Sequence, residues 1–116
     1  MNDRELLELA AKAAGHEILQ VREYEDGSGW WAVIRYDGSA MDFDPLGDDG
    51  DALRLAAHLQ IDVWHRQGHV GAGHPHKGLI RSFEAESTDR AAATRRAIVR
   101  AAAELARAAD AGGKEG

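Results

Sequence analysis

Three arginines near the C-terminus recur at a spacing that places them on one side of a helix. At 100° per residue, Arg96, Arg100 and Arg107 fall within about 40° of one another, opposite a face that carries Ile98 and Leu105. A row of guanidinium groups can bind phosphates or the carboxylates of a partner. We therefore predict a partner-binding site at these three arginines. The competing interpretation is a solvated helix face whose cations suit the helix dipole.

Four histidines lie in one short glycine-rich stretch, and histidine is a common metal ligand. They are His65, His69, His74 and His76. Glycines interrupt any helical spacing that would bring two imidazoles onto one face, and no cysteine assists. Ordering the loop around an ion would also cost conformational entropy. We therefore expect no metal and no cofactor, and an exposed loop at this position.

A run of aspartates superficially resembles a calcium-binding loop, in which several carboxylates converge on a hard cation. The acids are Asp42, Asp44, Asp48, Asp49 and Asp51. Pro45 interrupts the required order, and the glutamate that ends such loops is absent. Capping of the helix that follows explains these acids better than calcium does.

Motifs of known catalytic sites do not occur. No glycine-rich phosphate loop follows a strand, no Gly-x-Ser-x-Gly is present, and the chain has no cysteine. A carboxylate pair or a Ser, His and Asp trio could still converge in space, but a small antiparallel sandwich leaves little volume for a pocket of even about 300 Å³. We therefore expect a protein that is not an enzyme. We expect the aromatic residues to fill the core, since helices on both faces of a sheet would cover any aromatic platform for nucleic acid.

Length and composition bound the class of protein. The 116 residues, 44% of them hydrophobic and 29% charged, predict one domain over residues 1–110 and a disordered tail at 111–116. The net charge of −6 disfavours general binding to nucleic acid or to anionic membranes. The lack of cysteine, of a signal sequence and of a long apolar run indicates a cytoplasmic protein with no membrane partner.

Periodicity and turn residues predict the elements that must position these side chains. We expect strands at 17–24, 30–36, 61–66 and 79–86, and helices at 3–14, at 50–60 and from a cap at Ser87, Thr88 or Asp89 to about Ala109. Asn2 and Glu5 have capping-box spacing, and apolar residues on both faces of 30–36 indicate a central strand. The order αββαββα predicts an α+β fold: an antiparallel four-stranded sheet with helices packed on it as a three-layer α/β/α sandwich.

Two segments carry a family resemblance that spans about Trp30 to Arg107. One is Asp48-Asp49-Gly50-Asp51-Ala52-Leu53-Arg54-Leu55-Ala56, and the other is Ala92-Ala93-Thr94-Arg95-Arg96-Ala97-Ile98-Val99-Arg100-Ala101-Ala102-Ala103-Glu104. Together they resemble the phage α-β-α sandwich domain family, small bacteriophage and prophage proteins of generally unassigned function. The resemblance implies a fold and expression inside a bacterium, and it supplies no catalytic residues.

These observations favour a non-enzymatic phage or prophage accessory protein. We expect it to bind a host or phage macromolecule, preferably a protein, and to inhibit a bacterial defence or regulatory component, since small acidic proteins can cover basic surfaces by charge complementarity. One alternative is a nucleic-acid-binding module that uses Arg96, Arg100 and Arg107. A second is a small enzyme or metal-binding protein. A homodimer through a strand edge or the last helix also stays open.

Overall fold

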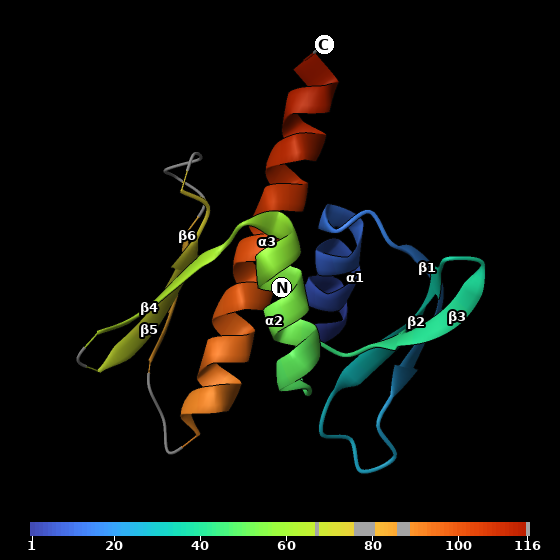
Figure 1. The fold of residues 1–116 in the computed structure, drawn as a ribbon, viewed down its shortest axis with the longest axis horizontal. Helices are drawn as coiled ribbons and strands as arrows, with labels where there is room; N and C mark the ends of the chain where they lie inside the picture. The colour runs from blue at the N-terminus through green and yellow to red at the C-terminus, as the bar shows by residue number, and fades with distance from the viewer. Residues whose placement is uncertain (67, 76–80, 86–88, 116) are drawn as a thin grey trace.

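The computed structural model describes residues 1–66, 68–75, 81–85 and 89–115, and within them it has three helices and six strands. In chain order they are α1 (Asp3–Ala13), β1 (Glu17–Glu23), β2 (Trp30–Tyr36), β3 (Ser39–Phe43), α2 (Asp49–Leu59), β4 (Asp62–Arg66), β5 (His69–Gly73), β6 (Arg81–Ala85) and α3 (Arg90–Glu115). Figure 1 traces them from blue to red. His76, Ser87, Thr88 and both ends of the predicted strand 79–86 lie outside the described residues.

The strands form two antiparallel sheets of three strands each. The α+β class is confirmed, but the predicted single four-stranded sheet is wrong. β1, β2 and β3 form the N-terminal sheet, and β4, β5 and β6 form the C-terminal sheet, each in chain order. β3 escapes prediction because its alternating acids suggest a loop, and it follows a two-residue turn at Asp37-Gly38, where φ is 51° and 79°. β5 escapes because it consists largely of glycine and alanine, which are depleted in strands.

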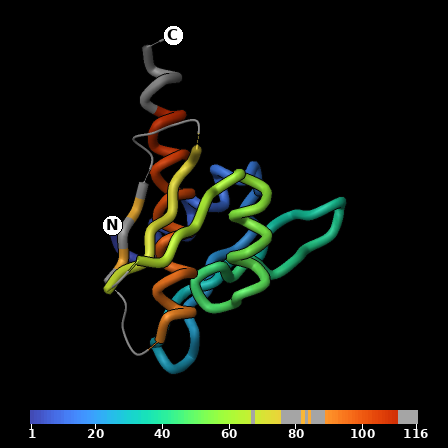
Figure 2. Tube along the Cα trace, turned by 60° about the vertical axis from the view of Figure 1, so that its left-hand side comes forward, coloured from blue at the N-terminus to red at the C-terminus, as the bar shows by residue number. Residues whose placement is uncertain are grey.

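The helices lie between the two sheets, which reverses the predicted order of layers (Figures 1 and 2). α1 packs on β1 and β2, α3 packs on β5 and β6, and both α1 and α2 pack on α3. Each sheet therefore has helices on one side. In β2, Ala32 and Ile34 are buried toward the helices. On the other face, the Arg22 guanidinium lies 5.8 Å from the Trp31 ring centroid, so the predicted helical cover on both faces of this strand is not found.

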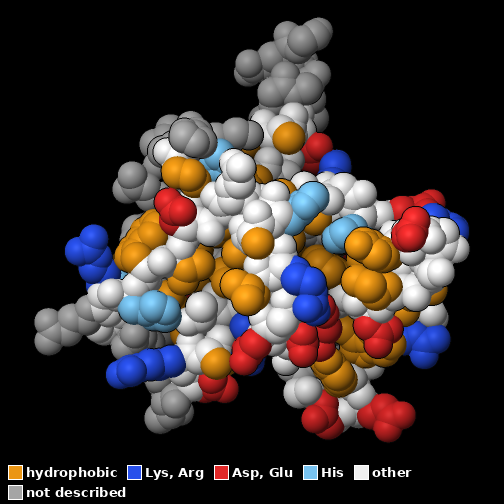
Figure 3. Space-filling model, in the orientation of Figure 1, with side chains coloured by type: hydrophobic (Ala, Val, Ile, Leu, Met, Phe, Trp, Pro, Cys, Tyr) orange, Lys and Arg blue, Asp and Glu red, His pale blue; other side chains and the backbone are white. Residues whose placement is uncertain are grey.

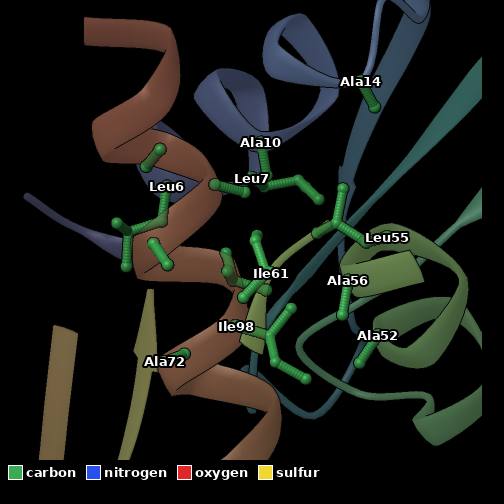
Figure 4. Packing of buried hydrophobic residues seen from close by; sticks show 14 of the residues in the cluster. Leu6, Leu7, Ala10, Ala14, Ala52, Leu55, Ala56, Ile61, Ala72 and Ile98 are labelled. Atoms are coloured by element: carbon green, nitrogen blue, oxygen red, sulfur yellow. The ribbon is translucent and has the colours of Figure 1, made fainter. Parts of the chain in front are cut away.

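α3 passes through the centre of the fold and is buried over much of its circumference. Its fully buried residues are Ala97, Val99, Ala101, Ala102 and Ala103. Because alanine favours the helix and has no bulk beyond Cβ, neighbouring helices can approach α3 closely. Figure 4 shows Leu7 of α1, Leu55 of α2 and Ile98 of α3 in one shared cluster. The three helices therefore share a single core.

The helix ends confirm the capping signals. The Asn2 side chain accepts the Glu5 N–H at 2.8 Å, and the Asp89 carboxylate accepts the Ala92 N–H at 2.9 Å. α3 continues past its predicted end to Glu115, so the predicted tail is helical as far as residue 115, while Gly116 lies outside the described residues. Extension of a helix that is already many turns long costs little per residue. No helix in the described part of the chain is long and apolar enough to cross a bilayer.

The contact between Gly71 and Trp64 gives a test of the C-terminal sheet. These two residues are register partners on β5 and β4, and a Cβ at position 71 would overlap the Trp64 indole. We expect Gly71→Ala to displace the ring and to lower the free energy of unfolding by about 1–3 kcal/mol, measured by denaturation with tryptophan fluorescence. Gly29→Ala is the control, because its Cβ would lie 3.8 Å from the Tyr24 ring, an ordinary contact. Equal losses in the two variants would contradict the steric argument.

Candidate functional site

The structure pairs the first two arginines of the predicted binding site with acids. Arg96 donates two hydrogen bonds to the Asp3 carboxylate, at 2.9 and 3.1 Å, and lies 3.8 Å from Glu84. Arg100 donates to Glu84 at 2.8 Å. Glu84 therefore brings Arg96 and Arg100 together. The pKa of Arg96 is raised, chiefly by its hydrogen bonds to Asp3.

The third arginine of the predicted site lies about two turns further along α3. Arg107 donates to Glu104 of the same helix at 3.2 Å. Since each of the three guanidinium groups already has a carboxylate partner, the row presents little uncompensated positive charge to a phosphate backbone. The structure thus places these three arginines on the surface of α3 in ion pairs with Asp3, Glu84 and Glu104 rather than as a free basic stripe.

Within the part of the chain that the structure describes, no group of three or more His, Cys, Asp or Glu side chains could hold a metal ion. His65 lies in β4, His69 begins β5 and His74 follows it. Among the aspartates of 42–51, Asp48 caps α2 by accepting the Asp51 N–H at 2.8 Å. The expected capping role of this acidic segment is therefore confirmed.

A wide groove of about 1000 Å³ runs between β3 and α2, so the expectation of little pocket volume is wrong. This β3–α2 groove is lined by Ala14, His16, Tyr36, Ala40, Met41, Asp42, Phe43, Asp44, Asp48, Asp51, Arg54, Leu55 and His58. On the face seen in Figure 3, histidine, hydrophobic and acidic side chains gather between α2 and the N-terminal sheet. We take this groove as the candidate functional site.

Two elements shape the groove in different ways. β3 and the residue after it contribute the consecutive run 40–44. Successive side chains of a strand point to opposite faces, so such a run marks the edge of the strand rather than one face. α2 contributes Asp51, Arg54, Leu55 and His58, whose spacing of three or four places them on one side of the helix. α2 packs on α3, which leaves this side turned toward the β3 edge.

Asp44 joins the end of β3 to the start of α2. Its carboxylate accepts hydrogen bonds from the Tyr24 hydroxyl and from the Gly47 N–H, the latter at 3.0 Å. Its own backbone N–H donates to the Asp51 carboxylate at 2.9 Å. Burial raises the pKa of Asp44, and the hydrogen bond with Asp44 is the main cause that raises the pKa of Tyr24 to about 12. The Tyr24 phenol therefore stays protonated and holds the loop after β3 in place.

Two histidines line the same groove. The half-buried His16 imidazole meets the Phe43 ring edge-on, with 5.3 Å between centroids and 66° between planes. Burial lowers the pKa of His16, and the nearby His58 lowers it further. The His16 imidazole is therefore neutral at pH 7, where it can both donate and accept a hydrogen bond.

The groove combines apolar surface with negative charge. Tyr36 is 56% exposed and Met41 is 38% exposed, while Phe43 and Leu55 are buried beneath. Four aspartates line the groove against a single arginine, Arg54. Arg54 is itself paired with Asp51 at 2.5 Å. Such a surface suits a ligand that carries both apolar and cationic groups.

Sequence reasoning identified the aspartates of this groove only as capping residues and missed His16, Tyr36, Met41 and His58. One local signal was available, because an Asp-Gly pair between alternating segments is a strong indication of a hairpin. It would have placed β3 directly after Asp37-Gly38. The approach of α2 to the β3 edge has no local signal, since it depends on how α2 packs on α3.

No family model matches this sequence, and no match is found among the curated proteins or the solved structures. The resemblance to the phage α-β-α sandwich domain family therefore stays a prediction that rests on its two segments.

Replacement of His58 tests whether burial or repulsion from His58 contributes more to the lowered pKa of His16. We expect His58→Gln to raise the pKa of His16 while leaving it below the value of an exposed histidine, about 6.5, because burial is the larger cause. NMR titration of the imidazole C–H signals measures this. His65→Gln, a replacement on the other sheet, is the matched control and should leave His16 unchanged. A His16 pKa that reaches the exposed value in His58→Gln would show that repulsion outweighs burial.

The lowered pKa of His16 also makes stability depend on pH. The unfolded chain binds this proton more readily than the folded chain does, so the stabilising contribution is complete above the unfolded pKa of about 6.5. It is lost as the pH falls through the lower pKa of the folded state. We expect the urea midpoint to fall between pH 7.5 and 5, and to fall less steeply in His16→Gln. Identical pH profiles for the two proteins would exclude His16 as a source of this dependence.

Proposed function

We propose that this chain is a non-enzymatic protein that binds a partner protein through the β3–α2 groove. In line with its family resemblance, we propose that it is a phage or prophage accessory protein, acts in the cytoplasm of a bacterial host, and inhibits a defence or regulatory component there. The partner surface is basic with apolar side chains interspersed. The protein would then act by covering a surface that its partner needs.

The observation that carries this proposal is the exposed apolar surface of the groove beside one acid, Asp42, that is unpaired within the described part of the chain. Tyr36 and Met41 are large and more than one-third exposed. Asp42 beside them is exposed, and no hydrogen bond or ion pair joins its side chain to any of the described residues. Exposed apolar groups rimmed by charge are typical of interaction sites. The net charge of −6 adds long-range attraction for a basic partner.

A nucleic-acid-binding role for the α3 arginines has less support. Such a role needs cations free to replace the counterions of phosphates. Arg96 and Arg100 are instead drawn to Asp3 and Glu84, so phosphate would have to displace these carboxylates first. The acidic groove would also repel a phosphate backbone. The structure offers no specific observation in favour of this alternative.

Capture from a bacterial lysate with groove variants tests the proposal. We expect the tagged protein to retain one dominant partner protein, identified by mass spectrometry, and Asp42→Lys or Tyr36→Ala to lose it. Calorimetry with that partner should show affinities weakened about tenfold or more by each change. Affinity should also fall with added salt, because screening weakens the charge attraction.

Two control variants match these changes outside the groove. Asp62→Lys makes the same charge change at an exposed position on β4, and Leu53→Ala removes an apolar side chain that is 69% exposed on α2 but does not line the groove. Both should keep the partner. If the Asp42→Lys and Asp62→Lys variants lost the partner equally, binding would depend on net charge alone and not on the groove. A partner that persists in both groove variants would place the interface elsewhere and contradict the proposal.

A further inference from the structure

The free edge of β3 has a regular pattern of backbone groups. β3 is the outer strand of the N-terminal sheet, and a two-residue turn joins it to β2. In such a hairpin the flanking pair, Tyr36 and Ser39, is hydrogen-bonded, and bonded pairs then alternate along the ladder. Ser39, Met41 and Phe43 therefore direct their N–H and C=O groups to β2. Ala40 and Asp42 direct theirs away from it.

The next position in this alternation shows where the edge points. The Asp44 N–H, two residues beyond Asp42, donates to the Asp51 carboxylate of α2 at 2.9 Å. The outward edge of β3 thus faces α2 across the groove. The Asp51 carboxylate accepts the hydrogen bond that the Asp44 N–H would otherwise donate to a carbonyl oxygen of a neighbouring strand. None of the described residues satisfies the outward backbone groups of Ala40 and Asp42 in this way.

The two edges of the N-terminal sheet differ. β1, at the opposite edge, has a register shift between Ile18 and Gln20 that interrupts its pairing. The pairing of β3 with β2 is regular from Ser39 to Phe43. Bulges are one of the devices by which proteins prevent a further strand from adding to an edge. β3 lacks this protection and lies open along the groove.

We propose that the β3–α2 groove takes an extended basic segment of the partner protein as a fourth strand on β3; this inference rests on the proposed function. The alternation of side chains across the sheet indicates which residue types the bound segment needs on each of its two faces. A residue opposite Asp42 would lie on the outer face, where a Lys or Arg pairs with the carboxylate. The neighbouring residue would lie beside Met41 and Phe43, where an apolar side chain meets the groove floor against Leu55. The favoured segment therefore alternates basic and apolar residues.

The strand-addition mode predicts new hydrogen bonds at two named amides. The probe is a synthetic peptide, acetyl-Lys-Val-Lys-Val-Lys-Val-amide, added to the full chain. We expect hydrogen exchange of the Ala40 and Asp42 amides, followed by NMR, to slow at least tenfold in the complex. Amides of β1 should not change. The same peptide with Glu in place of Lys, which keeps the pattern and reverses the charge, should bind at least tenfold more weakly.

Backbone methylation of the peptide separates strand pairing from side-chain binding. Two versions carry N-methyl groups, either on the three lysines or on the three valines. In an added strand antiparallel to β3 the lysines, which share the outer face with Asp42, carry the amides that face β3, whereas a parallel strand with the same faces presents the valine amides. The version that blocks the amides of the adopted orientation should therefore lose binding in that orientation, and the other version should retain it. A shift of register cannot rescue the blocked version, because it would exchange the two faces of the peptide.

Four results would overturn the inference. A peptide that perturbs Tyr36 and His58 without protecting Ala40 and Asp42 would rule out strand addition and leave the groove as a binding surface, and so would one that binds as tightly after N-methylation of both the lysines and the valines. A peptide that does not bind at millimolar concentration would also overturn it, while partner capture by the groove reports separately on the proposed function. Protection of both amides in a dimer of the free protein, detected by sedimentation, would assign the edge to a second copy of this chain.

Discussion

The close packing of α1 against α3 is the constraint on which the rest of the structure depends. α3 supplies the middle of the core, and most of its fully buried residues are alanines. Among them is Ala103, on the side of α3 where Arg96 and Asp110 pair with Asp3 and Lys12 of α1. These alanines permit a short distance between helix axes, because a larger side chain would push α1 outward and with it the N-terminal sheet. The ion pair between Asp3 and Arg96, 93 residues apart in the chain, lies at the same junction. The positions of both sheets follow from this helix pair.

The groove follows from how the surface of α3 is divided. α1, α2 and the C-terminal sheet all pack on this one helix, so α2 lies on α3 and does not cover the N-terminal sheet. α1 covers β1 and β2, and β3 extends beyond it. The Asp44 and Asp51 hydrogen bond then sets the approach of α2 to the strand edge at one end. Because the helices do not extend over β3, the edge of the N-terminal sheet stays uncovered there and forms one wall of the groove.

Local signals in the sequence predicted local structure well. α1, β1, β2 and α2 lie close to their expected ranges, and the caps at Asn2 and Asp89 were recognisable because capping depends on residues three apart.

The order of the helical and sheet layers was not predictable from such local signals. Alanine contributes little to a hydrophobic pattern, so α3 suggested one buried side and one basic side when most of its circumference is buried. The acids that pair with Arg96 and Arg100 are distant in sequence, and so is the contact between α2 and β3. The spacing of the arginines was therefore visible in the sequence, but the carboxylates that neutralise their charge were not.

Each sheet consists of strands that follow one another directly in the chain, and this has a consequence for how the protein is made. Pairing within a sheet requires only short connections, so both meanders can form early and independently. α1 covers the N-terminal sheet, whereas the apolar face of the C-terminal sheet and the side of α1 that faces away from its own sheet are covered by α3, which follows both in the chain. In a chain in which α3 has not yet formed, the N-terminal sheet with α1 would therefore leave the α3-facing side of α1 open to water, the kind of transiently exposed apolar surface that chaperones bind. The core is thus complete only when α3 has packed on α1, α2 and the C-terminal sheet.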